Sequence, residues 1–196
     1  MAEFVGRIIL FLMFKKLRTY SIISAALLAI AVLFYITYGR DKQAAKISYD
    51  TSCVTYEQHT IRGLSMKETF EDGQTVETLN GYFDCNSPES GQIVVIEFPT
   101  RDESFVKRIV ARSGDMLEFK EGFAKLNGEI LKNPAGVNYQ FSERSQKILS
   151  QSLYDGIIQD DYFLVLSDDA SSSAFDSRQY GFLDDDHLKG LVINNK

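Results

Sequence analysis

The sequence predicts a mainly β, antiparallel domain preceded by one transmembrane α-helix. Two observations lead to this fold class. The first is a run of 21 residues without charge, at residues 19–39, and the second is a series of short segments rich in β-branched and aromatic residues beyond residue 50. The chain has 196 residues, of which 44% are hydrophobic, and this fits one ordinary folded domain with a short appendage.

The uncharged run has the roughly 20 helical residues that span a bilayer. A cleaved secretory signal and a buried core helix are the alternatives. The run is long for the apolar region of a signal, and residues 35–40 lack the small-x-small cleavage pattern. We therefore expect a cytoplasmic or interfacial segment at 1–18, a transmembrane helix at 19–39, a stem at 40–50 and an extracytoplasmic domain at 51–196. The N-terminus is expected in the cytoplasm because four basic residues precede the run and three follow it: Arg7, Lys15, Lys16, Arg18, Arg40, Lys42 and Lys46.

Charge and cysteine content restrict the partners of the predicted domain. Beyond Lys46 the chain holds 14 basic and 25 acidic residues, a net charge of −11, which argues against nucleic-acid binding by this part. Cys53 and Cys85 are the only cysteines. An oxidising compartment would let them pair, and two free buried thiols are the alternative. A bridge would close a loop of about 32 residues and stabilise the fold by roughly 3 to 4 kcal/mol.

The strand-like segments follow one another with turn residues and few helical patterns between them, which is typical of an antiparallel barrel-like or sandwich domain. One helical pattern interrupts them at 142–153, with Ser142 as the N-cap and with Ile148, Leu149 and Leu153 on one face. The segments predicted as strands are 93–98, 104–111, 116–119 and 162–166.

Histidine-based and cofactor-based chemistries find little support in this sequence. His59 and His187 are the only histidines, and neither lies in a cluster with metal-ligand spacing. The Cys-x-x-Cys, Gly-x-Gly-x-x-Gly and phosphate-loop patterns are absent. We therefore expect no metal and no cofactor. What remains is a hydrolase in which an amine takes the proton of a serine, which lysine does when burial disfavours its ammonium form.

A serine and a lysine meet these requirements. Ser65 lies in a turn-like segment after a strand-like one, and Lys107 lies in an apolar strand whose alternation places it on one face with Phe105 and Ile109. That face is expected to point toward the core. Lys67 is a poor rival, because it is two residues from Ser65 and has no buried setting.

Four segments carry a family resemblance: residues 63–70 (GLSMKETF), 91–96 (GQIVVI), 105–115 (FVKRIVARSGD) and 167–181 (SDDASSSAFDSRQYG). In this order they resemble signal peptidase I, a serine–lysine protease that removes signal peptides from exported proteins. The first resembles the nucleophile motif, with Glu68 at a usual proline, and the second resembles the strand that follows. The third resembles the segment of the base, with Ser113 at another usual proline, and the fourth has one additional residue before Asp176.

The resemblance implies a role for each matching residue. Ser65 would be the nucleophile and Lys107 the general base, and the backbone N–H groups of Ser65 and Gly63 would bind the oxyanion. Ser173 is expected to hydrogen-bond Lys107. Asp176 and Arg178 are expected to form a supporting charge pair.

The resemblance also implies the setting of the reaction. The substrates would be signal peptides of preproteins with small residues before the scissile bond, met at the surface of the lipid bilayer of a bacterial-type cytoplasmic membrane. Two alternatives stay open because of the departures at Glu68 and Ser113. One is a peptidase specialised for pilin or conjugation subunits, and the other is a membrane-tethered β-domain that has lost activity.

Overall fold

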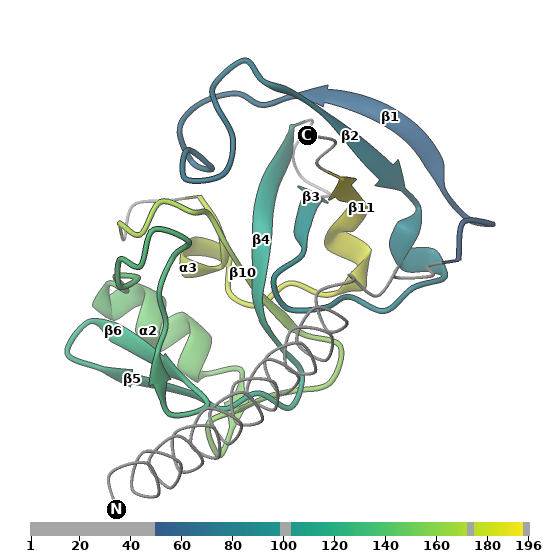
Figure 1. The fold of residues 1–196 in the computed structure, drawn as a ribbon. Coiled ribbons are helices and arrows are strands. Elements are labelled where there is room, and N and C mark those ends of the chain that lie inside the picture. Colours follow the sequence, from purple (N-terminus) through teal and green to yellow (C-terminus); the bar gives the residue numbers. More distant parts are fainter. Residues whose placement is uncertain (1–49, 99–102, 172–174, 194–196) are drawn as a thin grey trace, which may run out of the picture. The chain divides into compact units, whose positions relative to one another are not determined.

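The computed structural model describes residues 50–98, 103–171 and 175–193. The predicted segments 1–18 and 19–39 and nearly all of the stem lie outside these ranges. Within them, no helix is both long enough and apolar enough to cross a membrane. The described part is built mainly from antiparallel β-strands (Figure 1), which confirms the predicted class of the domain.

The main sheet has six strands in the order β1-β2-β11-β3-β4-β10, and every neighbouring pair is antiparallel. In Figure 1, β1 and β2 arch over one side of the fold, and β4 and β10 pass through its middle. The strands are β1 (Thr55–Thr60), β2 (Thr75–Asn80), β3 (Ile93–Glu97), β4 (Ser104–Arg112), β10 (Phe163–Leu166) and β11 (Leu188–Ile193).

The C-terminal strand β11 is inserted between β2 and β3, so the two ends of the described domain meet in one sheet. Gly190 makes this possible. A Cβ atom there would lie 2.7 Å from the Leu79 carbonyl oxygen and 2.7 Å from the Asn80 side-chain oxygen. Only glycine lets the two backbones approach this closely.

Strand β4 has the expected alternation of exposed and buried side chains. Lys107, Ile109 and Ala111 are buried on one face, and Phe105 on the same face is half-buried. The neighbouring side chains Val106 and Arg108 point to the other face and are also half-buried. The prediction that Lys107 points toward the core is therefore confirmed.

A second group of elements packs beside β10. It contains β5 (Leu117–Lys120), β6 (Phe123–Leu126), β7 (Glu129–Ile130), β8 (Leu153–Tyr154), β9 (Ile157–Ile158), α2 (Glu143–Ser150) and α3 (Ser177–Tyr180). Apolar side chains of β5, β6, β8, β9 and α2 share one cluster with β10, which includes Leu117, Phe141, Leu149 and Leu164. The short η1 (Tyr82–Asp84) and η2 (Asp185–His187) connect strands of the main sheet.

The predicted helix is present but shorter than expected. Ser142 is its N-cap, because its hydroxyl accepts a hydrogen bond from the Ser145 N–H at 3.1 Å. The assignment of Leu153 to the helix is wrong, because α2 ends at Ser150 and Leu153 pairs with Ile158 in the β8-β9 hairpin. The four predicted strands are confirmed with shifts of one residue at their ends.

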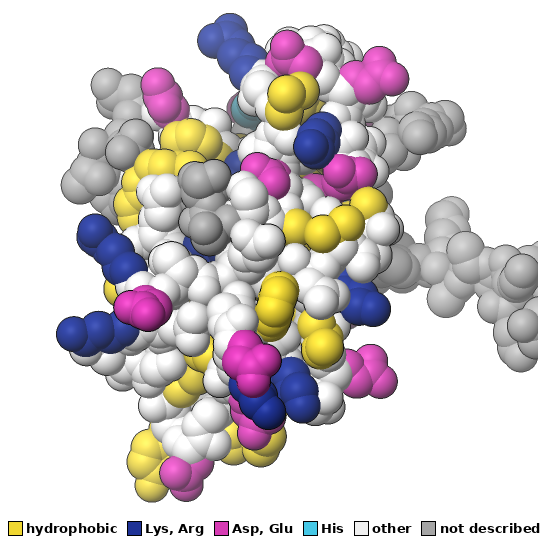
Figure 2. All heavy atoms as spheres, turned by 90° about the vertical axis from the view of Figure 1, so that its left-hand side faces the viewer, with side chains coloured by type: hydrophobic (Ala, Val, Ile, Leu, Met, Phe, Trp, Pro, Cys, Tyr) yellow, Lys and Arg dark blue, Asp and Glu magenta, His cyan; other side chains and the backbone are white. Residues whose placement is uncertain are grey.

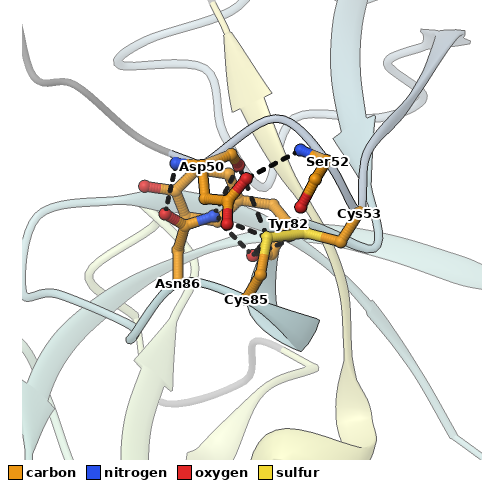
Figure 3. Close-up of a disulfide and its surroundings, with 6 residues drawn as sticks. All are labelled: Asp50, Ser52, Cys53, Tyr82, Cys85 and Asn86. Atoms are coloured by element: carbon orange, nitrogen blue, oxygen red, sulfur yellow. Dashed lines mark hydrogen bonds between the residues drawn. A yellow bond between two sulfur atoms is a disulfide. The ribbon is translucent and has the colours of Figure 1, made fainter.

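Cys53 and Cys85 form a disulfide, and their Cα atoms lie 6.2 Å apart. It joins the segment before β1 to the end of η1 (Figure 3). Around it, Asn86 donates to the carbonyl oxygens of Asp50 and Tyr82, each at 3.0 Å. The start of the described domain is thus held to the connection between β2 and β3.

Candidate active site

The nucleophile segment follows β1 as a tight series of turns. The N–H of Phe70 donates to the Met66 carbonyl at 2.7 Å, and Lys67 donates to the Leu64 carbonyl at 3.2 Å. Met66 and Phe70 are each 1% exposed and pack in a cluster with Ile61, Val76 and Val95. With these two side chains held in the core, Ser65 directly before Met66 is half-buried.

The side chains of Ser65 and Lys107 meet. Lys107 Nζ lies 3.0 Å from Ser65 Oγ, within the roughly 2.6 to 3.2 Å that proton transfer to a general base requires. The amine also donates to the Val106 carbonyl oxygen at 2.9 Å and lies 5.9 Å from the centre of the Phe105 ring. The ammonium group thus has one carbonyl, one hydroxyl and an aromatic face around it.

Burial changes the acidity of this lysine. Lys107 is 2% exposed, and loss of hydration is the largest influence, lowering its pKa from 10.5 to about 8. Asp176 and Asp168 raise the pKa by stabilising the ammonium form, while Arg178 lowers it. An amine with a pKa near 8 is partly neutral at physiological pH and can accept a proton from a serine hydroxyl.

The expected pair of Asp176 and Arg178 lies fully inside the protein. Arg178 donates from Nη2 to one carboxylate oxygen at 2.6 Å and from Nε to the other at 2.9 Å. Both side chains are 0% exposed. The carboxylate also accepts from the N–H and the hydroxyl of Ser167, at 2.8 and 2.9 Å. Every charge in this pair is therefore matched by hydrogen bonds, as burial requires.

A second ion pair, between buried Asp168 and half-buried Arg108, was not predicted as part of the site. Arg108 donates to Asp168 from Nε at 2.9 Å and from Nη2 at 3.0 Å, and it also donates to the Thr69 hydroxyl at 2.8 Å. Thr69 in turn donates to Asp168 at 2.5 Å. This network joins the nucleophile segment, β4 and the end of β10. Its sequence signal is Asp168, an acid that lies two residues after the apolar run 163–166.

The nucleophile segment is also joined to the chain after β10 by its backbone, because the Asp169 N–H donates to the Ser65 carbonyl at 3.1 Å.

Tyr139, 0% exposed, lies with its ring 5.4 Å from the guanidinium carbon of Arg178. Burial raises the pKa of Tyr139 above its ordinary value. Its hydroxyl makes no hydrogen bond with any described residue.

The two N–H groups expected to bind the oxyanion differ in their contacts. The Ser65 N–H makes no hydrogen bond within the described ranges. The Gly63 N–H, in contrast, donates to Asp72 Oδ1 at 2.7 Å, and Gly63 has a left-handed φ of 82°. This donor is therefore already engaged, by an acid that the sequence interpretation did not connect to it.

The predicted partner of Lys107 in the fourth motif, Ser173, lies outside the described residues. The neighbouring Ser171 is described, and its hydroxyl donates to Asp169 Oδ2 at 3.0 Å. The Ser171 carbonyl accepts from Arg178 Nη1.

Of the two departures from the family pattern, Glu68 is exposed, and the Ser113 hydroxyl donates to Asp160 at 3.0 Å.

A cleft of about 610 Å³ opens beside Ser65 and Lys107. One wall is formed by residues 58–62 at the end of β1, and the other by residues 103–107 at the start of β4. Ile61, Met66, Phe105 and Val106 give it apolar surfaces next to the serine. This arrangement suits an extended peptide with its backbone carbonyl at Ser65.

No group of acids, histidines or cysteines suited to a metal ion occurs in the part that the structure describes.

Several known proteins are similar to this chain. Signal peptidase IB of Staphylococcus aureus strain COL is 27% identical over 144 residues, which cover 68% of this chain and 74% of that protein. Signal peptidase I of Aquifex aeolicus is 28% identical over 99 residues, 49% of this chain and 39% of that protein. A crystal structure of a signal peptidase I from Enterococcus faecalis aligns with a TM-score of 0.42 and 18% identity, over 55% of this chain and 98% of that one. Residues 42–194 match the family described as signal peptidase, peptidase S26, and because this range covers most of the sequence, the chain belongs to that family.

Proposed function

We propose that this protein is a serine endopeptidase that cleaves N-terminal signal peptides from exported preproteins with a Ser65–Lys107 dyad. The observation that carries the proposal is the 3.0 Å contact between Ser65 Oγ and the buried amine of Lys107. Family membership supports the reaction class, and the relatives in Staphylococcus aureus and Aquifex aeolicus bear the name signal peptidase.

The reaction has two steps that this geometry serves. Ser65 Oγ attacks the carbonyl carbon before the scissile bond while neutral Lys107 takes the hydroxyl proton. The lysine then gives that proton to the leaving nitrogen as the C–N bond breaks, which leaves the signal peptide as an ester on Ser65. A water molecule hydrolyses the ester, with Lys107 again accepting a proton and returning it to Ser65.

The negative oxygen that forms in each step needs donors. The Ser65 N–H is suited to this role because no described residue occupies it. Gly63 would be the second donor, and its N–H would then have to leave Asp72 when substrate binds. Ser173 would orient the Lys107 amine. The buried pair of Asp176 and Arg178 would hold that loop in place.

The membrane setting follows from the sequence. A transmembrane helix at 19–39 would keep the N-terminus in the cytoplasm and the peptidase domain on the extracytoplasmic side of the bilayer. Signal peptides are themselves held in that membrane, so the anchor would raise the effective concentration of enzyme near its substrate. Apolar walls at Ile61, Met66 and Val106 line the place next to Ser65 where a small residue before the scissile bond would bind.

The test is cleavage of a purified preprotein by the full-length protein in detergent micelles. Ser65→Ala and Lys107→Ala are each expected to lower kcat at least about 10³-fold, because each removes one half of a unit that acts together. Lys67→Ala is the matched control, since this exposed lysine lies two residues from Ser65, and it should retain near wild-type activity. Cleavage that persists in either dyad variant would refute the proposed chemistry.

A further inference from the structure

The backbone N–H of Gly63, expected as the second oxyanion donor, is held by the carboxylate of Asp72. It donates to Asp72 Oδ1 at 2.7 Å, a short distance that is typical of a hydrogen bond to a charged acceptor. The intermediates of acyl transfer carry their negative charge on the former carbonyl oxygen, and that oxygen needs the same N–H. The Asp72 carboxylate and the oxyanion therefore compete for one donor.

The connection from β1 to β2 brings these two residues together (Figure 1). At its base, the N–H of Ile61 donates to the Gln74 carbonyl at 2.8 Å, and the N–H of Gly73 donates to the Ile61 carbonyl at 2.9 Å. These bonds continue the pairing of β1 with β2 beyond the strands themselves. The hairpin thus places Asp72 beside the start of the nucleophile segment.

The Gly63 N–H is directed at Asp72 and not into the cleft. The described residues that line the cleft include Arg62, Ser65 and Met66 but neither Gly63 nor Asp72. A Cβ atom added to Gly63 would meet no atom within 4 Å, so its peptide groups have room to turn. Gly63 has a φ of 82°, and glycine moves between the left-handed and other conformations at little cost. The N–H can therefore reorient.

Release of the Asp72 carboxylate costs little because it is exposed. Water replaces the lost hydrogen bond when Asp72 leaves Gly63. The oxyanion forms beside half-buried Ser65, where a preorganised donor stabilises it more than the same donor would in water. A carboxylate that stayed on the same N–H would also repel this second negative charge. Exchange of one anion for the other is thus favoured once substrate reacts.

We propose that Asp72 is a positioning residue that holds the Gly63 N–H away from the oxyanion until a substrate occupies the cleft. The oxyanion hole of the free enzyme then has the Ser65 N–H alone, and substrate binding completes it. Part of the binding energy of a good substrate is used for this step, which disfavours peptides that bind weakly. The inference rests on the proposed function and deepens it, because it concerns how the same site becomes active.

The test replaces Asp72 with asparagine, which keeps the shape and the acceptor oxygen but removes the charge. A neutral acceptor holds the Gly63 N–H less strongly, so Asp72→Asn should raise kcat/KM for a signal-peptide substrate about two- to tenfold. The gain should lie mainly in kcat, because the hole binds the oxyanion more tightly than the ground-state carbonyl. Full-length protein in detergent micelles is used throughout.

Glu71→Gln is the matched control for loss of one negative charge. Glu71 is the exposed neighbour of Asp72, and its side chain makes no hydrogen bond or ion pair with any described residue. Its kcat and kcat/KM should stay near the wild-type values. A gain in Glu71→Gln equal to that in Asp72→Asn would mean that the overall charge of the loop matters, and would overturn the inference.

A peptide aldehyde gives a readout that depends on the oxyanion hole itself. Ser65 Oγ adds to the aldehyde carbon, the hydroxyl proton passes to Lys107, and the former carbonyl oxygen becomes the oxyanion. Asp72→Asn should therefore bind the aldehyde about two- to tenfold more tightly than the wild type does. The corresponding peptide alcohol forms no oxyanion, so both proteins should bind it equally, which also shows that the cleft of the variant is folded.

The opposite changes would contradict this role of Asp72. Lower kcat or weaker aldehyde binding in Asp72→Asn, with unchanged binding of the alcohol, would mean that Asp72 supports the oxyanion hole and does not withhold a donor from it. Unchanged kcat and aldehyde affinity would overturn the inference as well. In both cases cleavage by the wild type leaves the proposed function intact. A wild-type protein that neither cleaves the substrate nor binds the aldehyde would contradict the proposed function, and this inference with it.

Discussion

At the scale of single residues, Lys107 is the group whose state decides the chemistry. Burial favours its neutral form and lowers its pKa to about 8, whereas in the unfolded chain it titrates near 10.5. Between these values the unfolded chain binds more protons than the folded one, so this lysine makes folding stability rise with pH from about 8 to 10.5. Below pH 8 its burial destabilises the fold. The protein thus gives up some stability to hold a base.

The buried Tyr139 hydroxyl offers a test of whether every buried polar group beside Arg178 has a hydrogen-bond partner. Its ring packs on Arg178, but its buried hydroxyl has no hydrogen-bond partner among the described residues. Tyr139→Phe keeps the ring and removes the hydroxyl, so we expect the free energy of unfolding to rise by about 1 kcal/mol. Chemical denaturation measures this change.

Tyr154→Phe is the matched control for this measurement. Tyr154 is 71% exposed, so loss of its hydroxyl should leave stability within about 0.5 kcal/mol of the wild type. A decrease of about 1 kcal/mol in Tyr139→Phe would mean that the hydroxyl has a partner, such as an ordered water, and would contradict this interpretation.

Residue patterns were informative where burial alone determines the direction of a side chain. Alternation in 104–111 placed Lys107 on the buried face, because Phe105 and Ile109 share its period. The contact of Asp72 with Gly63 and the network of Arg108, Thr69 and Asp168 were not predicted. These contacts join residues up to 99 positions apart, and a local pattern carries no information on such pairings.

At the scale of elements, the apolar strands were predictable and the polar ones were harder to recognise. β3 and β10 are short, largely buried apolar strands, and β4 alternates buried with half-buried side chains. β2 and β11 were missed, since TVETLN has little alternation and LKGLVI contains a glycine, which usually weakens a strand. Gly190 is tolerated because its neighbour, β2, approaches closely there. The tertiary environment overrides the local preference.

The disulfide is the element-scale feature with the clearest energetic consequence. Cys53 and Cys85 are 32 residues apart and enclose β1, the nucleophile segment and β2. Replacing both with serine should lower the free energy of unfolding by about 3 to 4 kcal/mol, because the unfolded chain gains conformational freedom. Urea denaturation of the variant measures this loss.

The control for this prediction is the wild-type protein reduced with dithiothreitol, which should unfold at the same urea concentration as the double variant. Reduction should leave the double variant itself unchanged. A wild-type midpoint that does not depend on reductant would contradict a stabilising role for the bridge.

At the scale of the whole molecule, the domain combines a buried charged centre with an acidic exterior. Figure 2 shows acidic, basic and hydrophobic side chains interspersed over one face of the molecule. The net charge of −11 beyond Lys46 contrasts with seven basic residues at or before it. In the proposed membrane setting, the basic N-terminal part would be attracted to an anionic membrane surface.

The sequence predicted the architecture of this molecule better than its connectivity. Strand content and the resemblance to signal peptidase I gave the fold class and the reaction class. The order of strands in the main sheet depends on β11 returning between β2 and β3, which no local signal indicated. The role of Ser173 as the partner of Lys107 and the membrane helix at 19–39 remain predictions from the sequence.

The central claim, that a neutral Lys107 activates Ser65, is tested most directly by the pH dependence of kcat/KM for the full-length protein with a signal-peptide substrate. The amine accepts a proton only when it is neutral, so activity should rise with pH and reach half of its plateau near pH 8, where the folded-state pKa of Lys107 lies. Lys107→Ala should remove the rise together with the activity. Activity that is independent of pH between 6 and 10, or a rise that survives in Lys107→Ala, would contradict the account.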